Sequence, residues 1–344
     1  MTGTNASAQD RLEPSTVVAA LEVAVRAPSI HNTQPWRWRL AEQGLFLLAD
    51  RERQLQVADP DGHSMLLSCG AALCLTEVGL RAAGYEIETT LLPDPADPDV
   101  LARFRVVGQR PPEAADEDNA LAEAALHRRS DRRPFSHDHV TADEVDTVQR
   151  AGTDQHAWVD FPSGEDQRVN LAVAVSWADQ IEKHDEELRA EASRWIHDPD
   201  VHSEPEGVSV EAFPHASPDA PRRTDIPLRD FEVGVNGRQL IERDVDEKPL
   251  IAVVLTEFDN PADHLAAGHA MMRVMLRAEL VGLATCPLSQ AVDFPAFRTR
   301  VQGLMGWVGY PQMMLRVGHP IAPDSQLAVT PRRPVSAVLE SAYG

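Results

Sequence analysis

The sequence predicts an α+β protein built from two related halves. Two helical segments, residues 70–84 and 268–282, carry glycine at both ends and apolar residues at matching positions, 198 residues apart. Each is followed later by a strand-like run that ends in glycine, at Gly108 and Gly318. We interpret this pattern as a duplication, with chance likeness between two core helices as the alternative. Strand-like runs alternate with helical stretches and cover residues 36–40, 45–49, 103–107, 250–255 and 313–317.

The two long helices differ in how much of their surface is apolar. In the second helix the apolar residues fall at the spacing of a single buried face. In the first, residues 65–75 are apolar on almost every side. A helix of this kind is usually enclosed by other elements, so we expect it at the centre of the molecule.

Two irregular segments divide the chain. Residues 110–120 are acidic and contain proline, which predicts a solvated linker between an N-terminal half, residues 1–110, and a C-terminal half, residues 111–344. Residues 196–228 are rich in proline, aspartate and histidine. A loop of this length is usually functional, so we interpret it as a lid-like insertion in the second half.

Composition excludes several classes of protein. The 344 residues carry a net charge of −22, which is opposite to the charge that binds a nucleic-acid backbone or an anionic membrane. The longest purely aliphatic run, residues 250–255, is too short to span a bilayer, and residues 1–10 do not resemble a secretory signal. We therefore expect a cytoplasmic protein with neither nucleic-acid nor membrane partners. Cys69, Cys74 and Cys286 lie in apolar stretches and predict core positions.

Familiar catalytic motifs are missing from the sequence. It contains no Rossmann glycine fingerprint, Walker A loop, H-E-x-x-H helix or G-x-S-x-G elbow. Four histidines could ligate a metal, but neither a cysteine pair nor helical i, i+4 spacing supports them. We therefore expect no metal site at these histidines, which are His137, His139, His197 and His202.

Two polar motifs stand out from the acidic background. Residues 27–36 read APSIHNTQPW and join a predicted helix to a predicted strand, with short polar side chains between two prolines. Residues 127–135 read HRRSDRRPF and place four arginines around Ser130. Guanidinium groups bind phosphate in a bidentate manner, and a hydroxyl can complete such a site. Taken singly, the first motif could be only a turn and the second only a solvated basic face.

Together the two motifs resemble the FMN-binding signatures of the nitroreductase family. The combination is similar to the Acg-type branch, in which two nitroreductase-like halves are fused, and the resemblance extends from about residue 14 to residue 339. It implies a nitroreductase-like fold and a tandem pseudo-dimer within one chain. It also implies a flavin site between the halves. The cofactor-binding residues are then Pro28, Ser29, His31 and Asn32 from the front half, and Arg128, Arg129, Ser130 and Arg132 from the rear half.

Two further segments are similar to family elements. Residues 282–289 resemble the stretch whose backbone passes the flavin ring near N5, with Pro287 and Leu288 nearest. The tail that begins at Arg332 resembles the element that brings another cation to the phosphate.

The sequence departs from an ordinary family member in an informative way. The front half has no R-x-S-x-R before residue 27, and the rear half reads GTDQHAW where its own A-P-S-x-x-N-x-Q-P-W would fall. One chain can therefore assemble one complete set of motifs. We expect one FMN per chain, a vestigial second site, and a monomer that needs no partner subunit, although further association is open.

The resemblance implies an oxidoreductase that takes hydride from NAD(P)H and reduces a nitroaromatic, a quinone or a similar small acceptor. The flavin carries this chemistry, so no catalytic side chain is named. A protein that sequesters FMN needs the same clamp and is the alternative function. A structural protein with decayed motifs is a third interpretation.

Overall fold

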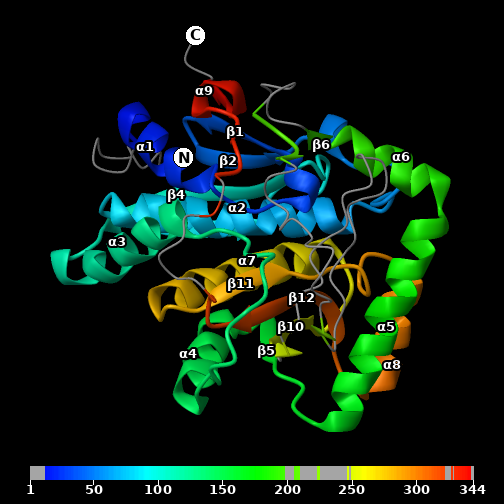
Figure 1. Ribbon diagram of the computed structural model, residues 1–344. Helices are drawn as coiled ribbons and strands as arrows, with labels where there is room; N and C mark the ends of the chain where they lie inside the picture. Colours follow the sequence, from blue (N-terminus) through cyan, green and yellow to red (C-terminus); the bar gives the residue numbers. More distant parts are fainter. Residues whose placement is uncertain are drawn as a thin grey trace.

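The computed structural model describes residues 12–197, 205–209, 223–224, 246–247, 249–321, 327 and 329–341. At its centre lie two long helices, α2 (His63–Ala82) and α7 (Pro261–Leu280), with one β-sheet on each side of the pair (Figure 1). Almost every residue of α2 is buried, as its all-round apolar sequence predicts. By length and composition α2 could cross a membrane, but 89% of that window is buried inside the protein.

Glycine allows the two central helices to touch at equivalent points. A Cβ atom on Gly70 would overlap the carbonyl oxygen of Leu265, and a Cβ atom on Gly268 would overlap that of Leu67. Gly70 and Leu67 lie 198 residues before Gly268 and Leu265. The contact is therefore reciprocal, as in a two-fold symmetric interface.

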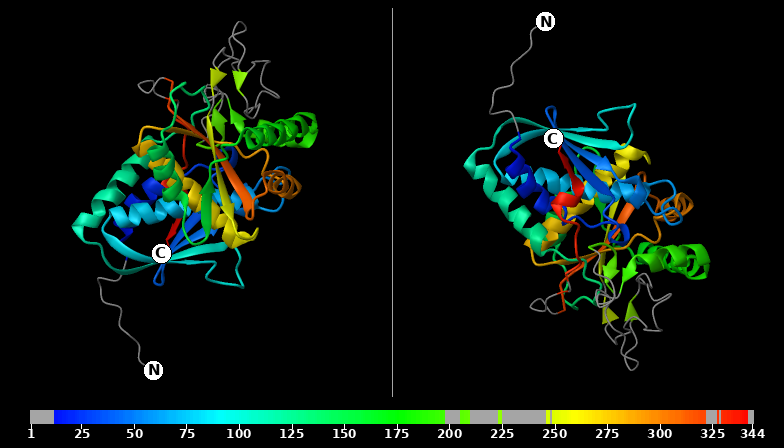
Figure 2. Two further views of the ribbon diagram at one scale, coloured as in Figure 1. Left: turned by 90° about the horizontal axis from the view of Figure 1, so that it is seen from below. Right: turned by 90° about the horizontal axis from the view of Figure 1, so that it is seen from above.

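The first sheet covers α2. It contains β1 (Trp36–Ala41), β2 (Gly44–Ala49), β4 (Val100–Gln109) and β3 (Tyr85–Leu91), in that spatial order, all antiparallel. Trp36, Trp38 and Leu40 point into the core, whereas the arginines between them are partly exposed. Strand β13 (Leu339–Ser341) pairs in parallel with β1, so residues 339–341 lie beside the first strand of the sheet (Figure 2).

The second sheet covers α7 and repeats this topology. Its strands are β5 (Ala157–Asp160), β10 (Leu250–Thr256), β12 (Tyr310–Gly318) and β11 (Ala284–Pro287), in that spatial order and again antiparallel. The order along the chain also matches, because among the four antiparallel strands of each sheet two precede the long helix and two follow it. The α+β class is confirmed, and the matching topologies support the duplication.

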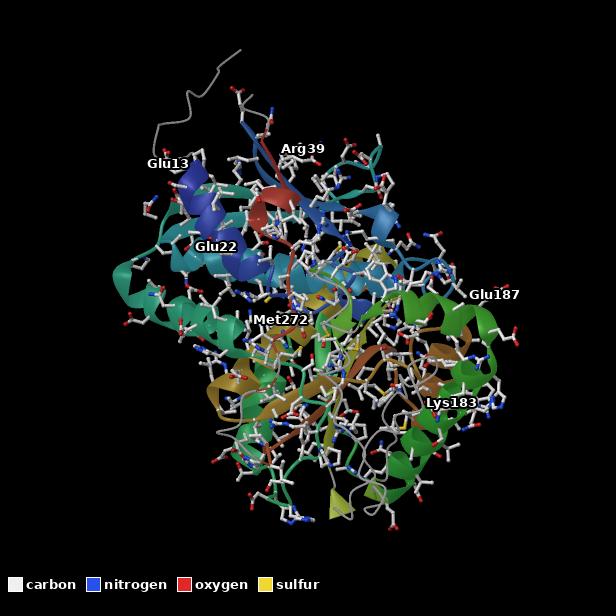
Figure 3. All side chains as sticks on the ribbon, turned by 45° about the horizontal axis from the view of Figure 1, so that its top comes forward. Glu13, Glu22, Arg39, Lys183, Glu187 and Met272 are labelled. Carbon is white, nitrogen blue, oxygen red and sulfur yellow. The ribbon has the colours of Figure 1, made fainter. Side chains whose placement is uncertain are left out.

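Strand β10 is buried on both faces, which explains its continuous run of apolar residues. Ala252 and Val254 join the main core, whereas Ile251, Val253 and Leu255 join a second core. Helices α5 (Glu165–His184) and α8 (Pro295–Met305) cover that second core. In Figure 3 Met272 of α7 lies in the interior, whereas Lys183 of α5 and Arg39 of β1 lie at the periphery.

The segment predicted as a linker is mostly helical. Helix α3 (Pro112–His127) begins within residues 110–120 and packs against α2 and α7. Ala124 and Ala125 are buried in the main core, and the acidic residues lie mainly on the opposite face. The linker prediction was wrong because the acidic residues and prolines were taken to indicate a loop, although the segment also has helical spacing. The domain boundary at residue 110 stays a prediction.

The remaining elements lie around this framework. They are α1 (Pro14–Ala24), α4 (Ala142–Gly152), α6 (Glu186–Arg194), α9 (Val335–Val338), the 3-10 turns η2 (Ile30–Asn32) and η3 (Arg51–Arg53), and the short strands β6 (Ile196–His197), β7 (Val208–Ser209), β8 (Arg223–Thr224) and β9 (Asp246–Glu247). The three cysteines are buried and free, as predicted.

Candidate functional site

The first polar motif forms a strained junction between α1 and β1. Three of its residues, His31, Asn32 and Gln34, have positive φ angles of 45°, 54° and 51°. Such backbone conformations cost energy outside glycine and cluster at functional sites. Hydrogen bonds hold the turn, because the Gln34 N–H donates to Ser29 Oγ at 2.9 Å and the Ile30 N–H donates to Oγ of Ser68 on α2 at 3.1 Å.

The amides of Asn32 and Gln34 connect the junction to two distant parts of the chain. Asn32 Nδ2 donates to the carbonyl oxygens of Gly207, at 2.8 Å, and of Pro331, at 3.1 Å. Gln34 Nε2 donates to the Pro205 carbonyl at 2.7 Å. The part of the predicted insertion described at residues 205–209 therefore lies on the junction, as does the C-terminal segment. Residues 198–204, 210–222 and 225–228 of that insertion lie outside the described residues.

A cluster of arginines lies next to the junction. Arg128 is buried at the end of α3, and its Nη2 donates to the Arg26 carbonyl at 3.4 Å. Burial, with repulsion from Arg129, lowers the pKa of Arg128 to about 10. Burial, with repulsion from Arg128 and Arg26, lowers the pKa of Arg332 to about 9. We call Arg26, Arg128, Arg129 and Arg332 the arginine cluster.

The arginine cluster leaves several N–H groups without acceptors. Nε and Nη1 of Arg128, Nε of Arg26 and Nε of Arg332 are buried, and none has a hydrogen-bond partner among the described residues. Asn32 Oδ1 and Thr33 Oγ1 of the junction are buried in the same condition. Unmet buried donors cost free energy unless a ligand satisfies them. Converging cationic donors of this kind fit an anion such as a phosphate.

The rest of the second motif connects the arginine cluster to β11. Ser130 forms a parallel bridge with Thr285, and the Asp131 N–H donates to the Thr285 carbonyl at 2.9 Å. Arg133 pairs with the buried Asp131, whereas the half-buried Arg132 lies between them in the chain. Nη1 of Arg129 donates to carbonyls at the end of α3, including Leu126 O at 2.8 Å. Arg129 therefore closes a helix end as well as adding charge to the cluster.

The segment after Thr285 has two sides. Pro287 and Ser289 are partly exposed, whereas Cys286, Leu288 and Gln290 are buried. The Leu288 N–H donates to the Met314 carbonyl at 2.8 Å, and its side chain belongs to the second core. The side chain of Leu288 is therefore part of the second core, and Pro287 and Ser289 form the exposed side of the segment.

The structure brings the two motifs together. Asn32 bonds to Pro331, the neighbour of Arg332, and Arg332 in turn lies close enough to Arg128 for their charges to repel. The sequence reasoning missed Arg26, although Arg26 directly precedes the first motif. The metal candidates do not converge with them: His137 and His139 are exposed, the His197 side chain is not described, and His202 lies outside the described residues.

The sequence did not indicate a further polar network, in which His63 and His264 are buried and Asp259 is exposed. Atoms of His63, Asp259 and His264 that could ligate a metal lie within 4.8 Å of one another. These groups already bind each other and their neighbours, because His264 pairs with Asp259 at 2.9 Å and the Arg298 guanidinium lies 3.2 Å from the same carboxylate. Arg298 therefore supplies the positive charge there. Burial, with the charge of Arg298, lowers the pKa of His63 to about 3, so its ring is neutral.

Comparison with known proteins identifies the family of the chain. The model of the nitroreductase family matches residues 125–319. A Mycobacterium tuberculosis protein named "Putative NAD(P)H nitroreductase Rv3131" is 35% identical over 329 residues, which are 95% of this chain and 92% of the relative. Another, "Putative NAD(P)H nitroreductase acg", is 32% identical over 331 residues, 94% of each chain.

Among solved structures, a nitroreductase with bound FMN from Bacteroides fragilis shares 16% identity, with a TM-score of 0.38 over 62% of this chain and 94% of that one. The family assignment depends on the family model and on the two Mycobacterium tuberculosis relatives. The chain therefore belongs to the nitroreductase family and is Acg-like.

Proposed function

We propose that this chain is an FMN-dependent oxidoreductase that takes hydride from NAD(P)H and reduces a nitroaromatic, a quinone or a similar small acceptor. The observation that carries the proposal is the arginine cluster with its buried, unmet N–H donors beside the strained junction. Membership of the family and the names of the two relatives support the flavin and the nicotinamide donor.

The arginine cluster would hold the FMN phosphate. Arg128 and Arg332 would donate to its oxygens, and the phosphate charge would relieve their mutual repulsion. The polar junction, with Pro28, Ser29, His31 and Asn32, would line the ring from the front half. Arg132 and the exposed side of residues 287–289 would face the ring from the rear half.

Each protein group then has a role in binding or electrostatics rather than in bond breaking. When bound, the flavin supplies hydride transfer at N5. A cation such as Arg132 near the pyrimidine edge would favour the anionic reduced ring over the neutral oxidised ring. Both substrates can use one space in turn, which agrees with the lack of a separate dinucleotide motif in the sequence. We place this activity in the cytoplasm, where reduced cysteines such as the three found here are usual.

A second candidate function is FMN storage. It is favoured by residues 205–209, because Gly207 and Pro205 accept the amide hydrogens of Asn32 and Gln34 and so cover the junction. A covered flavin would be bound tightly and reached poorly by a donor.

One experiment separates the two functions. Purified protein is loaded with FMN and mixed anaerobically with NADH or NADPH while the flavin absorbance is followed. Bleaching within catalytic turnover times is expected for the oxidoreductase, whereas a stable yellow complex would indicate storage. Protein that cannot be loaded with FMN would contradict both functions and support a structural protein with decayed motifs.

A further inference from the structure

Residues 205–209 bring a charged side chain to the junction in addition to their backbone contacts. Glu206 lies between the two residues whose carbonyl oxygens accept the amide hydrogens of the junction. Its carboxylate pairs with Nη2 of Arg53, in the turn η3. Nη1 of the same guanidinium donates to the Thr33 carbonyl at 3.0 Å. Glu206 therefore covers a cation that is itself fixed to the junction.

A second arginine, from the C-terminal segment, faces the same carboxylate. The Arg333 N–H donates to Gln34 Oε1 at 2.8 Å, so its backbone is also tied to the junction. Burial, with repulsion from Arg53, lowers the pKa of Arg333. The carboxylates of Asp50 and Glu206 oppose this shift, so both lie close to the Arg333 guanidinium. We call Arg53 and Arg333 the arginine pair.

The arginine pair is separate from the arginine cluster, although Arg332 and Arg333 are neighbours in the chain. The cations that repel Arg332 belong to the arginine cluster, whereas the cation that repels Arg333 is Arg53. The two neighbours therefore add their charges to two different groups. The arginine cluster would hold the FMN phosphate, and the arginine pair has no role in the proposed function so far.

Glu206 completes the charge balance of the arginine pair. Asp50 Oδ2 lies 3.8 Å from Nε of Arg53 and 3.5 Å from Nη1 of Arg333, so two guanidinium groups share one carboxylate. Arg37 lies 3.9 Å from the same oxygen, but it forms its own pair with a carboxylate of β13 at 2.6 Å. If the Glu206 carboxylate left, the group would carry one positive charge in excess.

The Glu206 carboxylate can be replaced at low cost. Its side chain is 25% exposed, compared with 17% for Arg53 and 10% for Asp50. Ion pairs that are open to water contribute little stability. The backbone of residues 205–209 is held to the junction by other bonds, so the side chain can turn away from Arg53 while that backbone stays in place.

We propose that the arginine pair binds a phosphate group of the nicotinamide donor, and that Glu206 occupies this site until the donor displaces it. The inference rests on the proposed function. Guanidinium groups bind phosphate in a bidentate manner, and a phosphate monoester carries up to two negative charges where Glu206 carries one. The phosphate is either the 2′-phosphate of NADPH or the pyrophosphate that NADPH and NADH share.

The donor is the molecule of the proposed reaction that fits this site. FMN would have its phosphate at the arginine cluster. Nitroaromatic and quinone acceptors carry no phosphate. The arginine pair contacts the junction at Thr33 and Gln34, next to the residues that would line the flavin ring. A dinucleotide whose phosphate binds there is thus held beside the place where its nicotinamide would meet the ring.

Direct binding tests the proposal without turnover. FMN-loaded protein is titrated in a calorimeter with NADP⁺ or NAD⁺, which do not reduce the flavin. Arg53→Gln and Arg333→Gln should each weaken dinucleotide binding by about 10-fold, because each removes a charged hydrogen-bond donor. Glu206→Gln should tighten it by about 5-fold, because the competing carboxylate is gone. Arg53→Lys, which keeps the charge, should restore part of the affinity.

The opposite signs distinguish a ligand site from a contact that only holds residues 205–209 in place. Glu206→Gln and Arg53→Gln break the same ion pair, so a purely structural contact predicts that both change the affinity in the same direction. Two matched controls, Glu187→Gln on α6 and Arg105→Gln on β4, change exposed charges elsewhere and should leave the affinity unchanged. Thermal unfolding checks that each variant is folded.

The comparison of the two dinucleotides identifies the phosphate. Effects confined to NADP⁺ would support the proposal with the 2′-phosphate as the group bound. Equal effects on NADP⁺ and NAD⁺ would support it with the pyrophosphate as that group.

The remaining outcomes separate this proposal from the proposed function. Wild-type protein that binds no FMN would overturn both. If the FMN-loaded wild type is bleached by NADH or NADPH, but Arg53→Gln and Arg333→Gln bind both dinucleotides as the wild type does, the phosphate-site proposal is wrong and the proposed function stands. A loss of affinity in Glu206→Gln equal to that in Arg53→Gln would also overturn the phosphate-site proposal.

Discussion

Arg128 is the residue at which stability and function are most clearly opposed. Its guanidinium is buried beside Arg129, close to Arg332, and two of its nitrogen atoms have no acceptor among the described residues. The carboxylate of Glu279 offsets part of this charge, and burial in turn raises the pKa of Glu279. Without an anion, desolvation and charge repulsion in the arginine cluster therefore lower the stability of the folded protein. A bound phosphate would reverse this loss.

We predict that Arg128→Met stabilises the FMN-free protein by about 1 kcal/mol while it weakens FMN binding by roughly 10- to 100-fold. Methionine fills a similar volume without a charge. Urea unfolding without flavin and fluorescence titration with FMN measure the two effects. Arg129→Met is the matched control, because Arg129 donates to carbonyls at the end of α3, and its loss should lower stability. A loss of stability in Arg128→Met equal to that in Arg129→Met would contradict the assignment.

Asp59, which lies just before α2, and His63, the first residue of α2, set opposing pH dependences. The pKa of Asp59 rises from 3.8 to about 7 on folding, so between these values the folded state holds the extra proton and stability falls as the pH rises. The pKa of His63 falls from 6.5 to about 3, so below pH 6.5 the unfolded state holds the extra proton and stability rises with pH. From about pH 4 to 6.5 the two effects cancel.

When one of the two residues is replaced, the free energy of unfolding should therefore change with pH as the remaining residue dictates. In Asp59→Asn, the stability relative to wild type should rise by about 1.4 kcal/mol per pH unit between about pH 4 and 6.5. In His63→Gln it should fall by about the same amount. Urea unfolding at several pH values measures both, and the two variants serve as controls for each other. Slopes of the same sign would show that one of the two shifts has been assigned the wrong direction.

Site residues were predictable where the motif itself carries the chemistry. Arg128 and Asn32 were identified because charged and amide groups are concentrated in two short stretches. Arg53 and Glu206 gave no such signal, since they are ordinary charged residues 153 positions apart that only the packing of residues 205–209 on the junction brings together. Leu288 was placed by resemblance alone, and the structure commits its side chain to the core.

At the scale of elements, the contact between α2 and α7 holds the two halves together. Gly70 and Gly268 allow the helix backbones to meet, and the Glu77–His269 pair lies across the same interface. A side chain at either glycine would have to push backbone rather than a flexible neighbour. Replacing glycine by alanine in a helix raises the free energy of unfolding by about 1 kcal/mol through helix propensity. A steric overlap with backbone lowers it by more than that.

We predict that Gly268→Ala destabilises the protein by about 3 kcal/mol or more, because the new methyl group meets the Leu67 carbonyl. Gly303→Ala is the control: this glycine also lies within a helix, α8, but a Cβ there meets nothing within 4 Å. It should be neutral or stabilising by up to about 1 kcal/mol. Thermal and urea unfolding measure both. Equal effects in the two variants would show that the helices can separate at little cost.

Long, strongly patterned elements were predictable and short ones were not. The strand-like runs at residues 36–40 and 250–255 correspond closely to β1 and β10. The alternating pattern of the first indicates one buried face, and the continuous apolar run of the second indicates two. The four-residue strands β5 and β11 carry too few residues for a period. Strand β13 is defined by its pairing with β1, a contact more than 300 positions away in sequence that no local pattern encodes.

At the scale of the whole molecule, the two halves share a topology but differ at one connection. The front half joins α1 to β1 through eleven residues, three of them at positive φ. The rear half joins α4 to β5 through four residues, closed by Asp154, whose Oδ1 accepts the N–H of His156 at 2.7 Å. The second connection is a tight turn with no room for the polar junction.

This asymmetry predicts one FMN per chain and a chain that needs no partner to bind it. The arginine cluster draws on Arg26 of the front half and Arg128 of the rear half, and the C-terminal segment adds Arg332, so one chain provides every part of one clamp. Flavin absorbance after denaturation, divided by protein concentration, should give a ratio near one, and light scattering of the same sample should give the monomer mass. As a control, Arg128→Met should reduce the flavin ratio without changing that mass. Two flavins per chain, or flavin bound only in a dimer fraction, would show that the four-residue turn or a second copy supplies a site, and the division of labour between the halves would then be wrong.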